Sequence, residues 1–251
     1  MRLGVVVLAL LGGCNQVFGL ESTQLRDGGD GADSNLDAPP AGCHFVELDA
    51  DIAAYIVDAG MYGKDSELFT DATHHTLVAF PMDGVGAAGE HIAGVVLKLA
   101  PITKCTDQCT PCLAAGAMPA TRFQAYWSWD IWNEGNVDET ERDSGNPWNA
   151  AGADAEGAMP GSGLADRSPR LVDAPMPPVD GTVYEFRVPR SAIESNRAEP
   201  WFGDHSGSTP VKRLTIQLRT DRLAAFASDD HDGSPCNEPE PLPRLTVTTC
   251  P

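Results

Sequence analysis

The stretch "FQAYWSWDI", Phe123 to Ile131, shows the clearest strand pattern in the chain. Its odd-numbered residues are apolar, whereas most of its even-numbered residues are polar. Because side chains along a strand alternate between two faces, this pattern predicts a strand whose odd face is buried. We therefore expect Trp127 and Trp129 to lie in a hydrophobic core. The odd set is Phe123, Ala125, Trp127, Trp129 and Ile131; the even set is Gln124, Tyr126, Ser128, Asp130 and Trp132.

Seven other segments have the same character. They are short, rich in β-branched and aromatic residues, and separated by Gly, Pro and Asp. No segment has a convincing helical repeat of apolar residues over three turns. Together the segments predict an all-β fold, an antiparallel β-sandwich of the jelly-roll kind. They are Ala54–Val57, Thr76–Phe80, Ile92–Leu99, Val183–Val188, Arg213–Arg219, Leu223–Ser228 and Arg244–Thr249.

The first residues, "MRLGVVVLALLGGC", have the features of an export signal. A basic residue precedes an apolar run that is too short to span a bilayer. The end of this run resembles a bacterial lipobox, which predicts a lipoprotein signal peptide over residues 1–13 and lipidation of Cys14. An ordinary secretory signal is the alternative. Residues 14–42 would then be a lipidated, Asp/Gly-rich tether and residues 43–251 the β-sandwich domain. We expect an exported protein anchored at the outer membrane or cell surface by its lipid.

The cysteines support export. Seven are present, and removal of Cys14 leaves an even number, as is typical of disulfides in an exported chain. A bridge between Cys43 and Cys250 would join the two ends of the domain, although the connectivity stays open. A zinc site on the closely spaced cysteines is the alternative. The predicted disulfide cysteines are Cys43, Cys105, Cys109, Cys112, Cys236 and Cys250.

The chain is strongly acidic, with a formal net charge of −19. Such a charge repels nucleic acid, so no nucleic-acid partner is expected, and membrane contact is expected only through the lipid anchor. The charge also disfavours an anionic polysaccharide. However, several basic residues fall between Arg187 and Arg222. They either form a local patch for uronate or sulfate groups or neutralise the acidic loops.

Acidic residues gather after the strand that holds Trp127. Calcium prefers carboxylate and carbonyl oxygens, which loops can supply. Asp130, Glu134 and Asp138 are therefore the candidate ligands for Ca²⁺, the one cofactor that the sequence suggests. A solvated acidic loop is the alternative, and a pair of glycosidase carboxylates is a further one.

Three aromatic residues are candidates for binding a sugar: Tyr126, Trp132 and Trp148. An aromatic ring beside carboxylates and amides can stack on a pyranose while the polar groups bind its hydroxyls. The alternative is that these rings pack within the fold. No catalytic residue is predicted, because the chain has no G-x-S-x-G, H-E-x-x-H, P-loop or dinucleotide-binding motif.

Several short motifs occur in a recognisable order. They are "YGKDSEL" (Tyr62–Leu68), "TLVAFPMDGV" (Thr76–Val85), "WNEGNV" (Trp132–Val137), "NPWNAAG" (Asn146–Gly152) and, near the end, "FASDD" with "PRLTVTT". In this order they resemble the DNRLRE-type β-sandwich family, which includes carbohydrate-binding modules of the CBM96 type. The resemblance covers most of residues 45–250, and "NQVFGLEST" after Cys14 is similar to the start of many myxobacterial surface lipoproteins.

That resemblance implies a non-catalytic protein that binds a polysaccharide or another cell-surface polymer. A structural or adhesive envelope lipoprotein without a sugar site is the alternative. A polysaccharide-degrading enzyme is the third hypothesis.

Overall fold

The computed structural model describes the domain that follows the predicted tether. The predicted signal peptide, the lipidation of Cys14 and nearly all of the tether lie outside the described residues, and so do Asp130, Cys109 and Cys236. The described residues are 41–57, 60–62, 67–82, 85, 90–105, 110–128, 132, 134, 136–138, 141–150, 153–156, 167–168, 170–176, 183–188, 202–205, 211–229 and 242–251.

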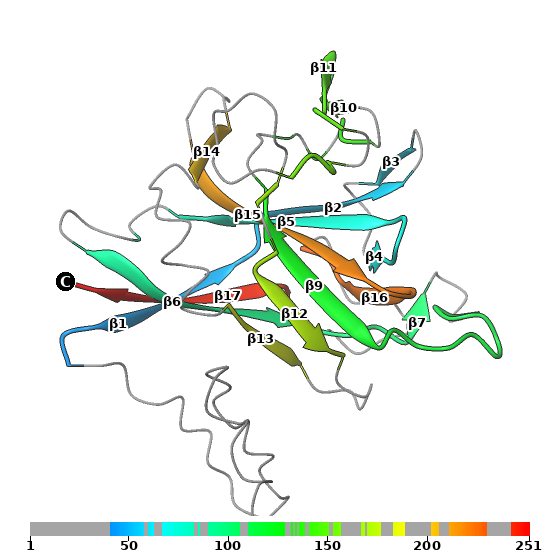
Figure 1. Cartoon of the computed structure of the whole chain (residues 1–251), viewed down its shortest axis with the longest axis horizontal. Coiled ribbons are helices and arrows are strands. Elements are labelled where there is room, and N and C mark those ends of the chain that lie inside the picture. Colours follow the sequence, from blue (N-terminus) through cyan, green and yellow to red (C-terminus); the bar gives the residue numbers. More distant parts are fainter. Residues whose placement is uncertain are drawn as a thin grey trace, which may run out of the picture. The chain divides into compact units, whose positions relative to one another are not determined.

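Two antiparallel sheets form the framework (Figure 1). The four-stranded sheet has the order β1 (His44–Asp49), β17 (Arg244–Cys250), β6 (His91–Leu99) and β13 (Tyr184–Val188). The seven-stranded sheet has the order β12 (Val172–Pro175), β9 (Arg122–Trp127), β15 (Val211–Thr220), β5 (His75–Pro81), β2 (Ile52–Val57) and β3 (Gly60–Tyr62). In addition, β14 (Phe202–His205) pairs with β15.

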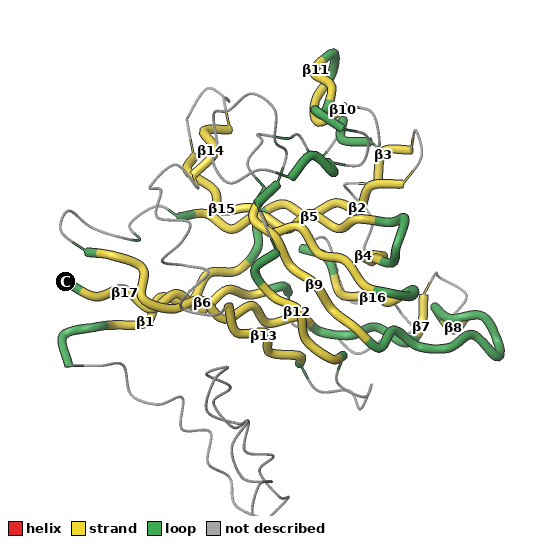
Figure 2. The backbone as a smooth tube through the Cα atoms, in the orientation of Figure 1, coloured by secondary structure: helices red, strands yellow, loops and turns green. Residues whose placement is uncertain are grey.

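Three two-stranded ribbons complete the described elements. They are β4 (Glu67–Thr70) with β16 (Ala224–Ala227), β7 (Lys104–Cys105) with β8 (Thr110–Pro111), and β10 (Glu141–Asp143) with β11 (Asn146–Pro147). The described part of the chain consists of strands and loops (Figure 2), and within it no helix could cross a membrane.

The strand order confirms the predicted antiparallel sandwich. The sheet β1-β17-β6-β13 packs against a second set, β5-β15-β9-β12, and β2 and β3 extend that second sheet at its edge. Most successive long strands pass from one sheet to the other, which is the double Greek-key arrangement of a jelly roll. All eight predicted segments contain strand. The strands that the prediction did not include are β1, β3, β4, β7, β8, β10, β11, β12 and β14.

The core between the sheets is built from alternate residues of their strands. Phe123, Ala125 and Trp127 on β9 are buried there, as the odd-face pattern predicts. Phe123 stacks on Phe186 of the opposite sheet with ring centroids 3.7 Å apart. Trp129 and Ile131 lie outside the described residues. Burial of these large rings supplies much of the hydrophobic stabilisation of the sandwich.

The outer face of the seven-stranded sheet is also covered. Tyr126 and Ser128 on the even face of the β9 segment are buried. The cover consists of described residues from the stretch between 132 and 168, which we call the cover segment. A second apolar cluster lies between cover and sheet, and it contains Ala54, Ile56, Leu77, Ala79, Trp132, Val137, Trp148 and Ala153.

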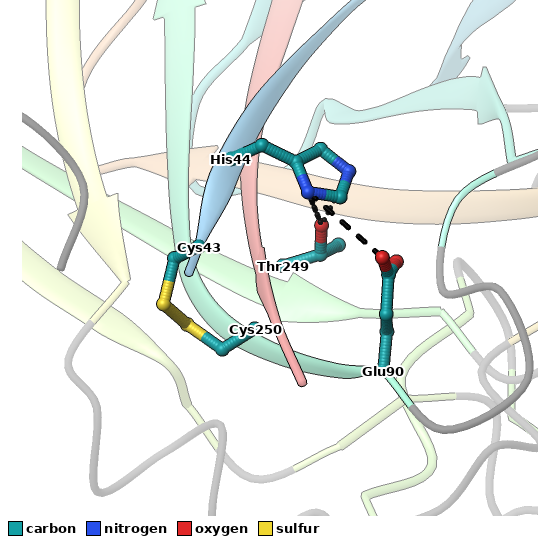
Figure 3. Close-up of a disulfide and its surroundings, with 5 residues drawn as sticks. All are labelled: Cys43, His44, Glu90, Thr249 and Cys250. Carbon is teal, nitrogen blue, oxygen red and sulfur yellow. Dashed lines mark hydrogen bonds and ion pairs between the residues drawn. A yellow bond between two sulfur atoms is a disulfide. The ribbon is translucent and has the colours of Figure 1, made fainter. Parts of the chain in front are cut away.

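A disulfide joins Cys43 to Cys250, as the sequence suggested (Figure 3). It ties the start of β1 to the end of β17. Beside it, His44 lies between Thr249 and Glu90, with 2.9 Å from its Nε2 to the Thr249 Oγ1. Cys112 is also disulfide-bonded, which removes it from the alternative zinc site. The side chain of Cys105 is not among the described ones.

Candidate functional site

The two candidate tryptophans are packing residues in this structure. Trp132 is 1% exposed, and its indole N–H donates a hydrogen bond to the Thr215 Oγ1 at 3.2 Å. Trp148 is 6% exposed, and its indole N–H donates to the Asp138 carbonyl at 2.8 Å. Both rings anchor the cover segment to the seven-stranded sheet. Neither offers an open face on which a sugar ring could stack, because the apolar cluster occupies that space.

Tyr126 is buried beneath two cations. The guanidinium carbon of Arg167 lies 4.1 Å from its ring centroid, and that of Arg219 lies 5.5 Å away. The Tyr126 hydroxyl donates to the Gln124 Oε1 at 3.0 Å. The ring face is therefore used for cation–π contacts within the protein. The expected exposed surface of Tyr126, Trp132 and Trp148 is not formed, because the cover segment closes over the sheet.

Asp154 lies in the cover segment, as does Arg167, and it joins both to Arg219 of β15. Its carboxylate bonds the Arg219 guanidinium and lies 3.5 Å from the Arg167 Nε. Arg167 also bonds the Glu156 carboxylate at 2.9 Å. Burial lowers the pKa of Arg219, and the hydrogen bond from Arg219 to Asp154 opposes this effect. We call Asp154, Glu156, Arg167 and Arg219 the charged clasp. Through Arg219 and the ring of Tyr126, it holds the cover segment against β15 and β9.

Two of the candidate calcium ligands, Glu134 and Asp138, accept hydrogen bonds from backbone N–H groups. The Glu134 Oε1 accepts a hydrogen bond from the Ala53 N–H at 3.2 Å, and the Asp138 Oδ1 accepts one from the Glu141 N–H at 2.7 Å. Asp130 lies outside the described residues. Within the described part of the chain, no three His, Cys, Asp or Glu residues are grouped so that they could hold a metal ion. A calcium site stays a prediction.

The basic residues between 187 and 222 whose side chains the structure describes do not form one patch. Arg213 is bound by the Asp51 carboxylate, and Arg219 belongs to the charged clasp. Arg222 donates to the Pro119 carbonyl at 3.4 Å. Charge neutralisation therefore explains Arg213 and Arg219. The side chains of Arg190, Arg197 and Lys212 lie outside the described set, and Arg187 lies on the other sheet.

The outer face of the four-stranded sheet differs from that of its partner sheet. Phe45 on β1 is 37% exposed, and Val183, just before β13, is 40% exposed. Only three large hydrophobic residues are exposed in the described part of the chain, and these are two of them. Phe45 shares its face of β1 with the exposed Glu47 and Asp49, whereas Val46 and Leu48 on the other face are partly buried. Val183 precedes the buried Tyr184, so both Phe45 and Val183 point away from the core.

Small side chains occupy the middle of this face. Phe45 pairs with Thr248, which pairs with Gly94 on β6. A side chain at position 94 would bring its Cβ to 3.2 Å from the Thr248 Oγ1, so glycine keeps this part of the face low. Val96 is the next outward residue on β6. The two central strands thus present a low surface of methyl and hydroxyl groups between the longer side chains of the two edge strands.

Charged residues border this low surface. The Lys98 ammonium reaches over the sheet to the Glu47 Oε1 at 3.1 Å, and the Arg244 Nε bonds the Asp49 Oδ1 at 2.7 Å. Glu185 and Arg187 project outward from β13. We call the set Phe45, Glu47, Asp49, Gly94, Val96, Lys98, Val183, Glu185, Arg187, Arg244, Thr246 and Thr248 the outer face.

The sequence analysis did not identify Phe45 as a site residue. The available signal was the alternation in "VELD", Val46–Asp49, which places Phe45 on the same face as the polar residues Glu47 and Asp49. Comparison with known proteins adds nothing to this geometry: a scan against protein-family models gives no match, and a search of curated proteins gives none either.

Proposed function

We propose that this protein is an exported, lipid-anchored β-sandwich that binds a polysaccharide or another cell-surface polymer without modifying it. The observation that carries the proposal is the outer face, where Phe45 projects beside the low surface formed by Thr248 and Gly94. An exposed ring gives the apolar face of a sugar a partner, and nearby hydroxyls and charged groups can bind its hydroxyls. The resemblance to carbohydrate-binding β-sandwiches supports the same function.

The alternative is a structural or adhesive envelope protein without a sugar site. The observation that favours it is the amount of internal fastening. The cover segment is held by two buried tryptophans and by the charged clasp, and the domain ends are joined by a disulfide. These features stabilise the fold, which both functions require. Only a binding measurement therefore distinguishes the two functions.

Affinity electrophoresis of the full chain through gels containing a panel of soluble polysaccharides tests the proposal. At least one polysaccharide should retard the wild-type protein, and Phe45→Ala should abolish that retardation. Met118→Ala is the matched control, because Met118 is an exposed hydrophobic residue outside the outer face. It should migrate like the wild type. Lack of retardation by every polysaccharide, with and without calcium, would favour the structural alternative.

A further inference from the structure

We propose that the disulfide between Cys43 and Cys250 is a mechanical link that carries tension from the predicted tether to the central strand β17 (Figure 3). This inference rests on the proposed function, because a protein that is anchored through its tether and bound to a polymer is pulled from two sides. It adds how the outer face stays assembled under that tension.

β1 is the strand of the four-stranded sheet that the core holds most weakly. It lies at the edge, and β17 is its only neighbour in that sheet. None of its side chains is fully buried, and only Val46 and Leu48 are partly buried. In β17, by contrast, most residues are buried. Because hydrophobic stabilisation grows with the apolar area that is removed from water, β1 gains little from the core.

The predicted tether joins the domain at the start of this weakly held strand. The pairs of β1 with β17 run in order from His44 with Thr249 to Asp49 with Arg244. A force that draws the start of β1 away from β17 therefore acts on the His44 pair first and on the others one after another. Since each backbone hydrogen bond contributes little net stability, opening the pairs singly needs less force than breaking them together. Without a further connection, β1 would be the first strand of its sheet to detach.

The disulfide lies directly before the first of these pairs. Cys43 precedes His44, and its partner Cys250 is the last residue of β17, with the two Cα atoms 4.2 Å apart. β17 lies between β1 and β6 and is paired with both. Tension that arrives at Cys43 therefore enters β17 through a covalent bond and is resisted by two strand ladders at once. The start of β1 cannot move away from β17 while this bond is intact.

The outer face depends on β1. Phe45 lies two residues after Cys43 and pairs with Thr248. Detachment of β1 from its start would remove Phe45 early, while the rest of the fold is still intact. The ion pairs of Glu47 and Asp49 lie further along the strand, so they do not hold its start. The disulfide thus protects the aromatic residue of the proposed binding surface from tension in the tether.

Optical tweezers with two attachment geometries test the inference on the full chain. In the N-terminal geometry, DNA handles are attached at the N-terminal end and at position 187, where a residue with a clickable side chain replaces the exposed Arg187 at the opposite edge of the sheet. In the C-terminal geometry, the first handle is moved to the C-terminal end. The wild type should unfold at the same force in both geometries, because the disulfide joins the two points at which the force enters.

The double variant Cys43→Ser/Cys250→Ser should separate the two geometries. In the N-terminal geometry it should show an early step, at a lower force than wild-type unfolding, with an extension of about 2 nm, the length of residues 43–49 at about 3.3 Å each. In the C-terminal geometry this step should be absent, because β17 is still paired on both sides. A general loss of stability lowers the unfolding force in both geometries alike and produces no such step.

Reduction of the folded wild type by a phosphine, while one molecule is held at low force, gives the same comparison without a variant that has to fold. The early step should appear in the N-terminal geometry alone. The phosphine also reduces the disulfide of Cys112, and the C-terminal geometry is the control for that effect.

An equal loss of unfolding force in both geometries, or no early step after reduction, overturns the inference. Either result leaves glycan binding, which is measured separately by affinity electrophoresis, unchanged. Failure of every polysaccharide to retard the protein overturns the proposed function without changing the result of the force measurement.

Discussion

Cys43 and Cys250 are bonded to each other across a sequence separation of 207 residues, with their Cα atoms 4.2 Å apart. The bond attaches an edge strand, β1, to a central strand, β17. β1 is the first described strand of the domain and has only one neighbour in its sheet. The disulfide therefore holds the end of the sheet where the predicted tether enters.

Loss of this bond should destabilise the domain substantially. Cys43→Ser and Cys250→Ser should each lower the free energy of unfolding by about 2–5 kcal/mol, because the unfolded chain regains the entropy of a long loop. Urea unfolding followed by tryptophan fluorescence measures the change. The double variant is the control: it should equal either single variant, since one bond is lost in all three. Additive losses would show that each cysteine contributes separately.

Replacement of Trp132 should separate packing from ligand binding. Trp132→Phe leaves the cluster partly filled but removes the hydrogen bond to Thr215, which should cost about 1–3 kcal/mol of unfolding free energy. Retardation by the polysaccharide that binds the wild type should not change. Urea unfolding and affinity electrophoresis of the same preparation give both results. Weaker retardation of a variant that is as stable as the wild type would show that Trp132 contributes to polysaccharide binding.

Removal of the charged clasp should loosen the cover segment. Asp154→Ala leaves the mostly buried guanidinium of Arg219 without its carboxylate, at a cost of about 1–3 kcal/mol. Hydrogen exchange detects local opening, so amides of the cover segment should exchange faster than those of β17. Glu47→Ala breaks an ion pair on the other sheet and is the control. It should leave exchange in the cover segment as in the wild type.

Asp221 should make the domain sensitive to acid. Burial raises the pKa of its carboxyl, but hydrogen bonds from Thr121 and Arg122 outweigh burial and lower the pKa to about 2. The stabilisation is therefore complete above the unfolded pKa of 3.8 and is lost as the pH falls toward 2.

Asp221→Asn tests this dependence in urea unfolding curves collected between pH 5 and 2. The variant should be less stable than the wild type at pH 5, and the difference should shrink as the pH falls. Asp71 has a similarly low pKa of about 2, so some acid sensitivity should remain in the variant. A constant difference across this pH range would show that the Asp221 carboxylate does not control it.

The local pattern of apolar and polar residues was sufficient to predict the strands that form the core. The alternation in residues 123–127 identified the buried face of β9, because strand geometry fixes the period at two. The strand β1 was missed, since its exposed edge position leaves polar residues in half of its positions. The pairing of Cys43 with Cys250 was suggested by position alone, and only the antiparallel register of β1 on β17 decides it.

The sequence by itself determined the class of fold, the alternation of the strands and the inward direction of Trp127. It could not determine which outer sheet face is covered. The local sequence determines to which side of the sheet each side chain of a strand points. Whether that side is exposed to solvent depends on a segment that is distant in the sequence. The cover segment closes over β9 and buries Tyr126, Trp132 and Trp148, whereas Phe45 remains exposed on the other sheet. Only the tertiary structure shows that these three rings are buried, and for this reason the binding site that we propose lies on the outer face.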